Sequence, residues 1–299
     1  MTRLKLDSAT VQLVLCIAEE GSISRAADRL SLAAAAASRR VSDLEQQLGA
    51  PLFTRVAHGV KITEAGSRLL AHIRQIDHLI DRLEEDAAVL SSGHDARVVI
   101  AAPKAAMIQF LAADLARLRQ AYPQITLKVI EENSRIVQQL LRDRVIDIGI
   151  YEKTSGFLDL PQFDYRHDEL VLVYSRAHYA FGGEAVGIDA LLELPIVTLG
   201  KGSAVLTAIQ RGFRSRGRAF STQLITSGFD SMLALVRHGL GVGLMPPAVL
   251  HSLHPEAGLG TVALEGDWAR RAYVLSAALG HAQQQALQNV LALLREPPR

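Results

Sequence analysis

The sequence predicts two kinds of fold along one chain: a small helical domain with a β-hairpin at the N-terminus, and an α/β fold in the rest. Three observations support this prediction. Apolar residues recur at helical spacing in residues 1–62, a heptad-spaced apolar stripe occupies residues 63–92, and strand-like and helix-like segments alternate over residues 97–299. With 299 residues, of which 49% are hydrophobic, the chain is long enough for two or three packed domains.

The N-terminal part of the chain contains two short amphipathic segments, residues 24–30 and 34–48, only a few residues apart. This is the spacing of a helix-turn-helix motif. The apolar stripe of the second segment comprises Ala37, Val41, Leu44 and Leu48. Its opposite face is small and polar, with Ala35, Ser38, Arg39, Ser42 and Gln46. Such a face fits a DNA major groove, although an ordinary solvated helix face is the alternative.

A β-hairpin is expected directly after this helix. The helix ends at Gly49, and residues 52–55 and 60–62 then form two short strands around a turn at His58. A hairpin in this place is the wing of a winged helix-turn-helix domain, which we expect over residues 1–62.

In these residues the chain resembles the LysR-type transcriptional regulators. The resemblance is dense over the first 66 residues and thinner, but continuous, to the C-terminus. The pieces that carry it are Ala18-Glu19-Glu20-Gly21-Ser22, Arg25-Ala26-Ala27-Asp28-Arg29-Leu30, Ser38-Arg39, Leu44-Glu45, Leu48-Gly49, Pro51-Leu52-Phe53, Arg55 and Ile62-Thr63-Glu64-Ala65-Gly66. The resemblance implies a regulator that binds double-stranded DNA and a small-molecule effector. It also implies a homodimer or tetramer, with RNA polymerase as a further partner.

The start of the second helix departs from this family, which usually has Ser-Gln-Pro-Ala-Leu where the chain has Ala33-Ala34-Ala35-Ala36-Ala37. Loss of the N-cap serine costs about 1 kcal/mol of helix stability unless Ser31 substitutes. Loss of the glutamine removes a side chain that reads adenine, so base reading depends on thymine methyls, on Arg39 or Arg40, and on DNA shape. We expect DNA contacts at Arg25, Ala34, Ala35, Ser38, Arg39, Ser42, Arg55 and His58. The His58 contact is expected to weaken as pH rises.

Composition limits the classes of function. Lys and Arg number 32 against 31 Asp and Glu, so DNA contact must come from placed charges rather than from a global basic field. The single cysteine, Cys16, is expected to be a buried structural thiol. No stretch approaches the roughly 20 apolar residues of a membrane span, and Glu19 and Glu20 stand where a signal peptide would be cleaved. We therefore expect a cytoplasmic protein.

Residues 63–92 predict one long linker helix. Thr63 is its expected N-cap. The negative charge of Glu64, in the first turn, interacts favourably with the positive end of the helix dipole. Apolar residues repeat in steps of four and three at Leu69, Ile73, Ile76, Ile80, Leu83, Ala87 and Leu90. This heptad repeat predicts a two-helix coiled coil and hence a dimer. Packing against the chain's own C-terminal domain is the alternative. Residues 91–95 form the expected hinge.

Residues 97–299 predict an effector-binding domain with two α/β lobes, lobe I (97–163 and 268–299) and lobe II (164–267), joined by two crossovers. Expected strands are 97–101, 126–131, 145–151 and 271–276 in lobe I, and 168–174, 195–199, 224–227 and 242–245 in lobe II. Expected helices are 104–120, 134–142, 204–214, 229–238 and 282–294. Two lobes joined in this way resemble the periplasmic-binding-protein architecture of the family's effector domain.

Ligands of such sheets bind outside the carboxyl ends of the strands, where helix N-termini converge. The candidate effector-binding residues at these ends are Pro103, Lys104, Ser134, Gly200, Lys201, Ser203, Gly228, Phe229 and Asp230. Free amides, hydroxyls and two lysines favour a small anion such as a carboxylate. Asp230 opposes a purely anionic ligand, and it is expected to pair with a lysine or to meet an amine. Taken singly, each of these residues is better explained as a helix cap.

Other kinds of site find little support in the sequence. His251 and His254 lack further metal ligands, and the glycines of residues 239–243 lie between a helix and a strand, the reverse of the order that cradles phosphate. No nucleophile and base are paired, so we expect no catalytic residues, no metal and no cofactor. A solute-binding receptor or carrier that has lost DNA reading is the main alternative function, and an enzyme using the same cleft is a weaker one.

Overall fold

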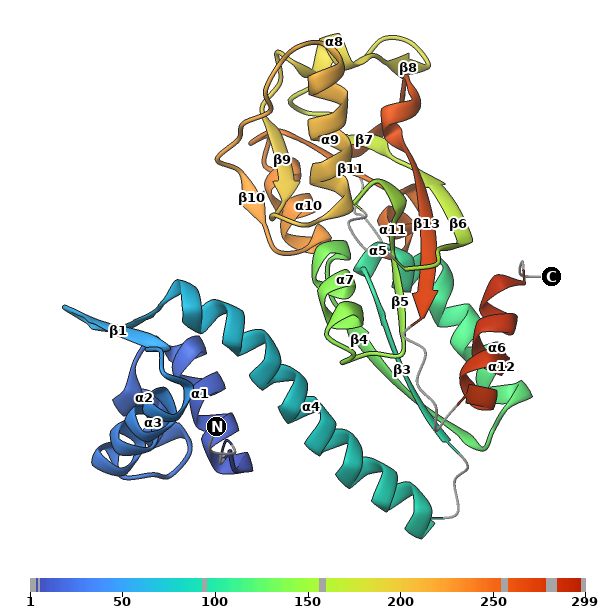
Figure 1. Ribbon diagram of the computed structural model, residues 1–299. Helices are drawn as coiled ribbons and strands as arrows, with labels where there is room; N and C mark the ends of the chain where they lie inside the picture. The colour runs from blue at the N-terminus through green and yellow to red at the C-terminus, as the bar shows by residue number, and fades with distance from the viewer. Residues whose placement is uncertain are drawn as a thin grey trace. The chain divides into compact units, whose positions relative to one another are not determined.

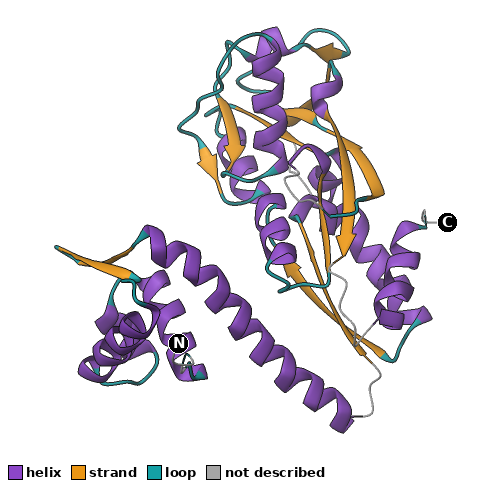
Figure 2. Cartoon of the chain, in the orientation of Figure 1, coloured by secondary structure: helices purple, strands orange, loops and turns teal. Residues whose placement is uncertain are grey.

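The computed structural model describes residue 4 and residues 6–92, 96–155, 160–253, 258–277 and 284–296. The expected hinge is therefore only partly covered, because residues 93–95 lie outside this set. The chain divides near residue 93 into two compact units, an N-terminal helical unit and a C-terminal α/β unit (Figure 1; Figure 2). Each unit has its own hydrophobic core.

The N-terminal unit is a winged helix-turn-helix that continues into a long helix. Its elements are α1 (Ser8–Glu20), α2 (Ile23–Arg29), α3 (Ala34–Leu48), β1 (Phe53–Val56), β2 (Gly59–Ile62) and α4 (Glu64–Ser92). Asp7 caps α1 by accepting a hydrogen bond from the Thr10 amide at 2.8 Å. Gly21 and Gly49 adopt left-handed backbone conformations where α1 and α3 end, which glycine tolerates without steric cost. The α3 bounds and the antiparallel hairpin agree with the prediction.

The core of this unit buries the apolar stripe that helical periodicity predicts for α3. Ala37, Val41 and Leu44 are buried and pack with the inward faces of α1 and α2. Cys16 is buried as expected, with its sulfur 3.9 Å from the Ala26 carbonyl oxygen. The opposite face of α3 is thereby left on the surface of the unit.

The first turns of the long helix α4 pack in this core, and the rest of the helix extends beyond the core. Thr63 caps its first turn through its hydroxyl oxygen, as predicted. Leu70 and Ile73 are buried because they complete the core beneath α1. Further along, Leu79 and Leu83 are 63% and 70% exposed. Of the predicted heptad stripe, Ile73 is thus used inside the unit, whereas Leu83 is exposed and available to another chain; Leu70 and Leu79 lie outside the stripe.

The C-terminal unit has two lobes, each built on one sheet. The sheet of lobe I has the strand order β4-β3-β5-β13-β6, with β3 (Ala96–Ala102), β4 (Ile125–Glu131), β5 (Ile148–Glu152), β6 (Phe163–Glu169) and β13 (Arg270–Ala277). The sheet of lobe II has the order β10-β9-β11-β7-β12-β8, with β7 (Val171–Ser175), β8 (Ala185–Val186), β9 (Ile196–Leu199), β10 (Ile225–Thr226), β11 (Val242–Met245) and β12 (Leu259–Leu264). Strand β3 runs parallel to β4 and β5, whereas β13 runs antiparallel to β5 and β6.

Helices cover the faces of both sheets (Figure 2). Lobe I carries α5 (Lys104–Ala106), a π-helical turn (Met107–Leu111), α6 (Ala112–Ala121), α7 (Ser134–Arg142) and α12 (Gln284–Arg295). Lobe II carries α8 (Ile188–Leu191), α9 (Ala204–Ser215), α10 (Phe229–Arg237) and α11 (Pro247–Ser252). Single 3-10 turns occur at Lys153–Ser155 and Asp267–Ala269. The last helix packs on β3, β6 and α6, so the C-terminal segment returns to lobe I as predicted.

One segment differs from its predicted form. The single strand expected over residues 168–174 is two strands, β6 in lobe I and β7 in lobe II, separated by the buried Leu170. The chain therefore changes sheets at Leu170, later than the boundary expected near residue 163. Strands β6, β8 and β12 and helices α8 and α11 are additional to the predicted set.

Candidate functional site

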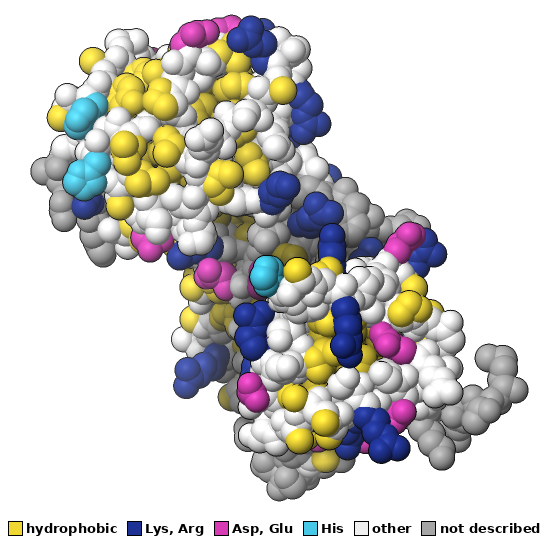
Figure 3. Space-filling view, turned by 90° about the vertical axis from the view of Figure 1, so that its left-hand side faces the viewer, with side chains coloured by type: hydrophobic (Ala, Val, Ile, Leu, Met, Phe, Trp, Pro, Cys, Tyr) yellow, Lys and Arg dark blue, Asp and Glu magenta, His cyan; other side chains and the backbone are white. Residues whose placement is uncertain are grey.

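The exposed face of α3 is the candidate DNA-reading surface. Ala34, Ala35, Arg39 and Ser42 are exposed and Ser38 is half-buried, while the apolar stripe lies in the core. Basic and acidic side chains are interspersed on the face of the molecule seen in Figure 3, in keeping with the near-neutral composition. Any affinity for DNA therefore depends on individual side chains of this kind.

The N-terminus of α3 has no side-chain cap. Ala33 occupies the N-cap position with an extended backbone (φ −68°, ψ 132°) and offers no hydrogen-bond acceptor. Ser31 does not substitute for the missing serine, and it adopts a left-handed φ of +56° in the preceding turn. The amides of the first turn of α3 are consequently left for water or for an anionic group such as a phosphate.

The two adjacent arginines of α3 have different roles. Arg40 donates to both carboxylate oxygens of Asp7, at 3.1 and 3.0 Å, and to the Thr10 hydroxyl at 3.1 Å. Hydrogen bonds from Thr10, together with Arg40, hold the pKa of Asp7 below its ordinary value. Arg40 thus fastens α3 to the start of α1. Arg39 is exposed and has no ion-pair partner among the described residues, so it is the arginine available to DNA.

The remaining predicted DNA contacts lie on α2 and the wing. Arg55 and His58 are exposed on the hairpin. Arg25 is also exposed, but its guanidinium bonds the Glu20 carbonyl oxygen and lies 3.8 Å from the Glu20 carboxylate. A phosphate contact by Arg25 would have to compete with this pairing.

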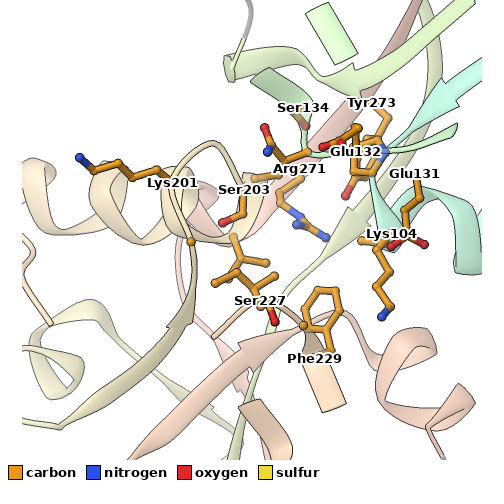
Figure 4. A pocket seen from close by; sticks show the side chains of 18 residues that line it. Lys104, Glu131, Glu132, Ser134, Lys201, Ser203, Ser227, Phe229, Arg271 and Tyr273 are labelled. Atoms are coloured by element: carbon orange, nitrogen blue, oxygen red, sulfur yellow. The ribbon is translucent and has the colours of Figure 1, made fainter. Parts of the chain in front are cut away.

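The C-terminal unit contains a cavity of about 280 Å³ whose walls come from both lobes. Figure 4 shows the side chains that line it. Eight of the nine predicted residues are among them, namely Pro103, Lys104, Ser134, Gly200, Lys201, Ser203, Gly228 and Phe229. Asp230 is not, because its carboxylate folds back beside Gly228 at the start of α10. The strand-end rule therefore led to residues that line one cavity, with Asp230 outside its lining, and their contact with an effector stays a prediction.

Four of the described helices begin at this cavity, α5, α7, α9 and α10. Asn133 caps α7, because its side-chain oxygen accepts hydrogen bonds from the amides of Arg135 and Ile136 at 3.1 Å. Ser203 caps α9 in the same way. Helix α10 begins after Gly228 without a side-chain cap. The start of α10 therefore has amides without a side-chain cap and the positive end of a helix dipole, although the carboxylate of Asp230 lies beside Gly228 in the same turn.

The predicted polar residues of the cavity differ in their availability to a ligand. The Nζ atom of Lys104 would be 3.8 Å from a Cβ placed on Gly228, so this ammonium group lies at the start of α10. The exposed side chain of Lys201 extends away from the cavity (Figure 4). Ser134 is fully buried and accepts a hydrogen bond from the Glu152 amide at 3.2 Å, which ties α7 to β5. Of these side chains, Lys104 has the geometry expected of an anion contact.

Six polar residues of the lining are not among the nine predicted ones: Glu131, Glu132, Asn133, Ser227, Arg271 and Tyr273. The side chain of Arg271 is 1% exposed, and its Nε and Nη2 donate to the two carboxylate oxygens of Asp168 at 2.8 and 2.5 Å. Gln109, in the π-helical turn, donates to the same carboxylate at 2.7 Å. Such hydrogen bonds offset the desolvation of a buried ion pair. The sequence signal for this pair was an arginine inside an otherwise apolar strand.

Tyr273 lies two residues after Arg271, on the same side of β13. It is completely buried, and its hydroxyl has no hydrogen-bond partner among the described residues. Burial, more than the neighbouring charges, raises the pKa of Tyr273, so the phenol stays protonated. A buried hydroxyl without a partner costs about 1–3 kcal/mol.

The two lobes approach each other directly at one rim of the cavity. Gly202, in the loop before α9, has a φ of +86°, and a Cβ added there would be 2.5 Å from the Asn133 side-chain oxygen of lobe I. Only a glycine fits this combination of backbone conformation and spacing. A change in the distance between the lobes would therefore be felt first at this contact.

Other kinds of site are not seen in the described part of the chain. Within it, no group of three or more His, Cys, Asp and Glu could hold a metal ion. His254, one member of the His251 and His254 pair, lies outside the described residues. No described helix is both long and apolar enough to cross a membrane.

Both units match descriptions of one protein family. Residues 9–67 match the "Bacterial regulatory helix-turn-helix protein, lysR family", and residues 91–298 match the "LysR substrate binding domain". A relative from Synechococcus elongatus, named a probable nitrogen assimilation transcriptional activator, is 29% identical over 245 residues, which are 80% of this chain and 78% of that one. The transcriptional regulator YofA of Bacillus subtilis is 26% identical over 247 residues, 82% of this chain and 83% of that one.

Solved structures share the fold over nearly the whole chain. The crystal structure of CbnR, a LysR family transcriptional regulator, covers 97% of this chain and 98% of its own with a TM-score of 0.70 and 17% identity. Full-length CbnR complexed with its target DNA gives a TM-score of 0.68 at 17% identity. Sequence, fold and family descriptions agree: the chain belongs to the LysR family of transcriptional regulators, with a helix-turn-helix DNA-binding domain and an effector-binding domain.

Proposed function

We propose that this regulator binds double-stranded DNA as a homodimer, and that a small organic anion in the cavity between the lobes changes its state on DNA. The observation that carries the proposal is the cavity of about 280 Å³, with Lys104 beside the uncapped start of α10. An anion there is attracted by both the ammonium group and the helix dipole. A ligand that contacts both lobes favours one lobe arrangement over another and so shifts the balance between them.

The effector proposal is tested by thermal shift and calorimetry with small carboxylates. Lys104→Ala should lose about 1.5–3 kcal/mol of binding free energy, as for a hydrogen bond to a charged group. Lys201→Ala is the matched control, because the Lys201 side chain extends away from the cavity, and its affinity should equal that of the wild type. A preference for neutral or cationic ligands, or an equal loss in both variants, would remove the anion from the proposal.

For DNA, we propose that the exposed face of α3 enters the major groove, with Arg39 on the backbone and the wing residue Arg55 beside it. The small side chains of Ala34 and Ala35 let the helix backbone approach the bases closely. Because Ala34 and Ala35 cannot form the paired hydrogen bonds that glutamine or arginine makes with a base edge, affinity comes mainly from phosphate contacts. Binding is then salt-sensitive and only moderately selective for sequence.

The DNA proposal is tested by gel-shift and salt titration on the protein's own upstream DNA and on an unrelated duplex. Arg39→Ala should weaken binding to both and flatten the salt dependence by about one unit of slope. Arg40→Ala is the control, since Arg40 is engaged with Asp7; it should lower stability and keep the slope. An unchanged slope in Arg39→Ala would remove this face from the interface. Failure of the wild type to bind either duplex would favour the solute-binding receptor instead.

For the dimer, we propose that the later part of α4 pairs with the same helix of a second copy. Leu83 of the predicted heptad stripe is exposed, and so is Leu79, which lies outside the stripe one helical turn earlier; large exposed apolar residues on one side of a helix favour a partner helix. Sedimentation should show the Leu79→Asp, Leu83→Asp variant as a smaller species, whereas Arg68→Asp, on an exposed part of the helix, should keep the wild-type mass. A cytoplasmic location, assembly to a tetramer, contact with RNA polymerase and the lack of enzymatic activity are inferred from the family.

A further inference from the structure

Tyr273 presents an unused hydrogen-bonding group in the wall of the cavity. Its hydroxyl is buried and forms no full hydrogen bond with a described residue, because the nearby Asp168 carboxylate already accepts hydrogen bonds from Arg271 and Gln109. Buried polar groups nearly always have a partner, and the exceptions mark places where a ligand or an ion completes the site. Because burial keeps the phenol protonated, the hydroxyl can donate a hydrogen bond.

The ring of Tyr273 is held in place, so the hydroxyl has little freedom to find another partner. Tyr273 pairs with Glu152 of β5 and Arg166 of β6 in the middle of the lobe I sheet. Phe110 packs edge-on against its ring with centroids 6.0 Å apart, and the Arg271 guanidinium lies 5.5 Å from the ring centroid. Strand pairing and packing on two sides therefore fix the point at which a ligand would meet the hydroxyl.

The charges around this point favour an uncharged acceptor. The positive charge of Arg271 is balanced by Asp168, which takes two of its three guanidinium nitrogens. Beyond the effect of burial, Arg271 lowers the pKa of Tyr273, whereas Asp168 and Glu152 raise it. The Glu152 carboxylate is itself 3.9 Å from the Arg211 guanidinium. Each of these two carboxylates already has an arginine partner, so a second carboxylate of a ligand would lie beside them without an unpaired cation to compensate its charge. A neutral oxygen would accept from the hydroxyl without that repulsion.

The charged groups at the mouth of the cavity also favour a ligand with only one negative charge. Lys104 and the start of α10 attract a single carboxylate. Glu131 and Glu132 also line the cavity, and the Asp230 carboxylate lies beside Gly228; all three oppose further negative charge. Lys201, which could have balanced them, extends away (Figure 4).

We propose that the effector is a monocarboxylate that carries a second, uncharged oxygen, such as a ketone, amide or hydroxyl, and that Tyr273 selects it by donating a hydrogen bond to this oxygen. The carboxylate is held by Lys104 and the start of α10. The inference rests on the proposed function, an anion in this cavity, and adds the class of ligand and the residue that discriminates it.

Calorimetry on the full-length protein tests this with acids matched in chain length from four to six carbons. The five-carbon set, for example, is pentanoate, 4-oxopentanoate, glutarate and 5-aminopentanoate. The oxo acid should bind the wild type about three- to tenfold more tightly than the plain acid, as for one neutral hydrogen bond. Tyr273→Phe should abolish this advantage of the oxo acid over pentanoate. Tyr151→Phe is the control: Tyr151 is also buried, but its hydroxyl bonds Ser276 at 2.8 Å, so its removal should keep the advantage.

The outcomes distinguish a failure of the role of Tyr273 or of the ligand class from a failure of the anionic effector itself. An oxo-acid advantage that persists in Tyr273→Phe would overturn the role of Tyr273. Tightest binding of the dicarboxylate or of the amino acid by the wild type would overturn the ligand class, and this readout needs no variant to fold. Absence of binding by every acid would overturn the anionic effector itself, and the role of Tyr273 with it.

Discussion

Replacing Asp168 with Asn should strongly destabilise the C-terminal unit. The side chains of Asp168 and Arg271 are 4% and 1% exposed, and the two carboxylate oxygens accept two hydrogen bonds from the guanidinium and one from Gln109. Asparagine keeps the shape of this group but leaves the arginine as a buried cation without a counter-charge. Breaking a buried pair in this way costs about 3–5 kcal/mol, a large part of the roughly 5–15 kcal/mol that stabilises a typical domain.

Urea unfolding followed by tryptophan fluorescence measures this effect, because Trp268 is the only tryptophan of the chain and is buried in lobe II. Asp164→Asn is the matched control. It breaks the exposed pair with Lys153 and should hardly move the midpoint. Replacing both members of the buried pair with apolar residues should recover much of the loss. If Asp168→Asn unfolds at the same urea concentration as the control, the pair does not stabilise the C-terminal unit as argued.

Three further outcomes are expected. Ala33→Ser should supply the missing cap of α3 and stabilise that helix by about 0.5–2 kcal/mol; slower amide exchange in its first turns would show this, and unchanged exchange would contradict it. Gly202→Ala should weaken effector binding and lower the thermal midpoint, because its φ is +86° and its Cβ would clash with Asn133; wild-type values for both would refute the rim contact. The pKa of Asp7 is held below its ordinary value of 3.8, chiefly by hydrogen bonds from Thr10, so its contribution to stability is present above that value and is lost as pH falls through the lower folded pKa. In Asp7→Asn the acid sensitivity of α1, followed by circular dichroism, should decrease; an acid transition identical to the wild type would count against this pairing.

The N-terminal unit could be predicted well because its signals are local. The spacing of Ala37, Val41 and Leu44 defined the buried face of α3, and Gly49 defined its end. The passage between the lobes could not be predicted in the same way. Between Phe163 and Ser175 no glycine or proline marks a turn, yet the chain changes sheets at Leu170. A single buried residue is enough to take the chain from one sheet to the other, and such a passage has no turn-forming residue by which the sequence could reveal it.

The cavity residues that could be predicted follow parallel strands, whereas two of the residues that were missed belong to an antiparallel strand. The strand-end rule selects the residues that come directly after the carboxyl end of a parallel strand, and it found Lys104 and Ser203. Arg271 and Tyr273 stand at the beginning of β13, which runs antiparallel to β5. The start of an antiparallel strand lies at the same edge of the sheet as the ends of its parallel neighbours, so β13 contributes its first residues to the cavity. Its direction became known only from the pairing.

The two roles of α4 limit how the protein can be divided. Leu70 and Ile73 lie beyond the hairpin in sequence, yet they share one core with Val14, Leu44 and Leu52. Each fully buried apolar side chain of this size is worth about 1.5–3 kcal/mol, and a domain of roughly 60 residues has little stability to spare. A fragment cut after residue 62 would therefore expose its own interior. An autonomous DNA-binding fragment has to include at least the first three turns of α4, and any rotation of that helix turns the reading face of α3 with it.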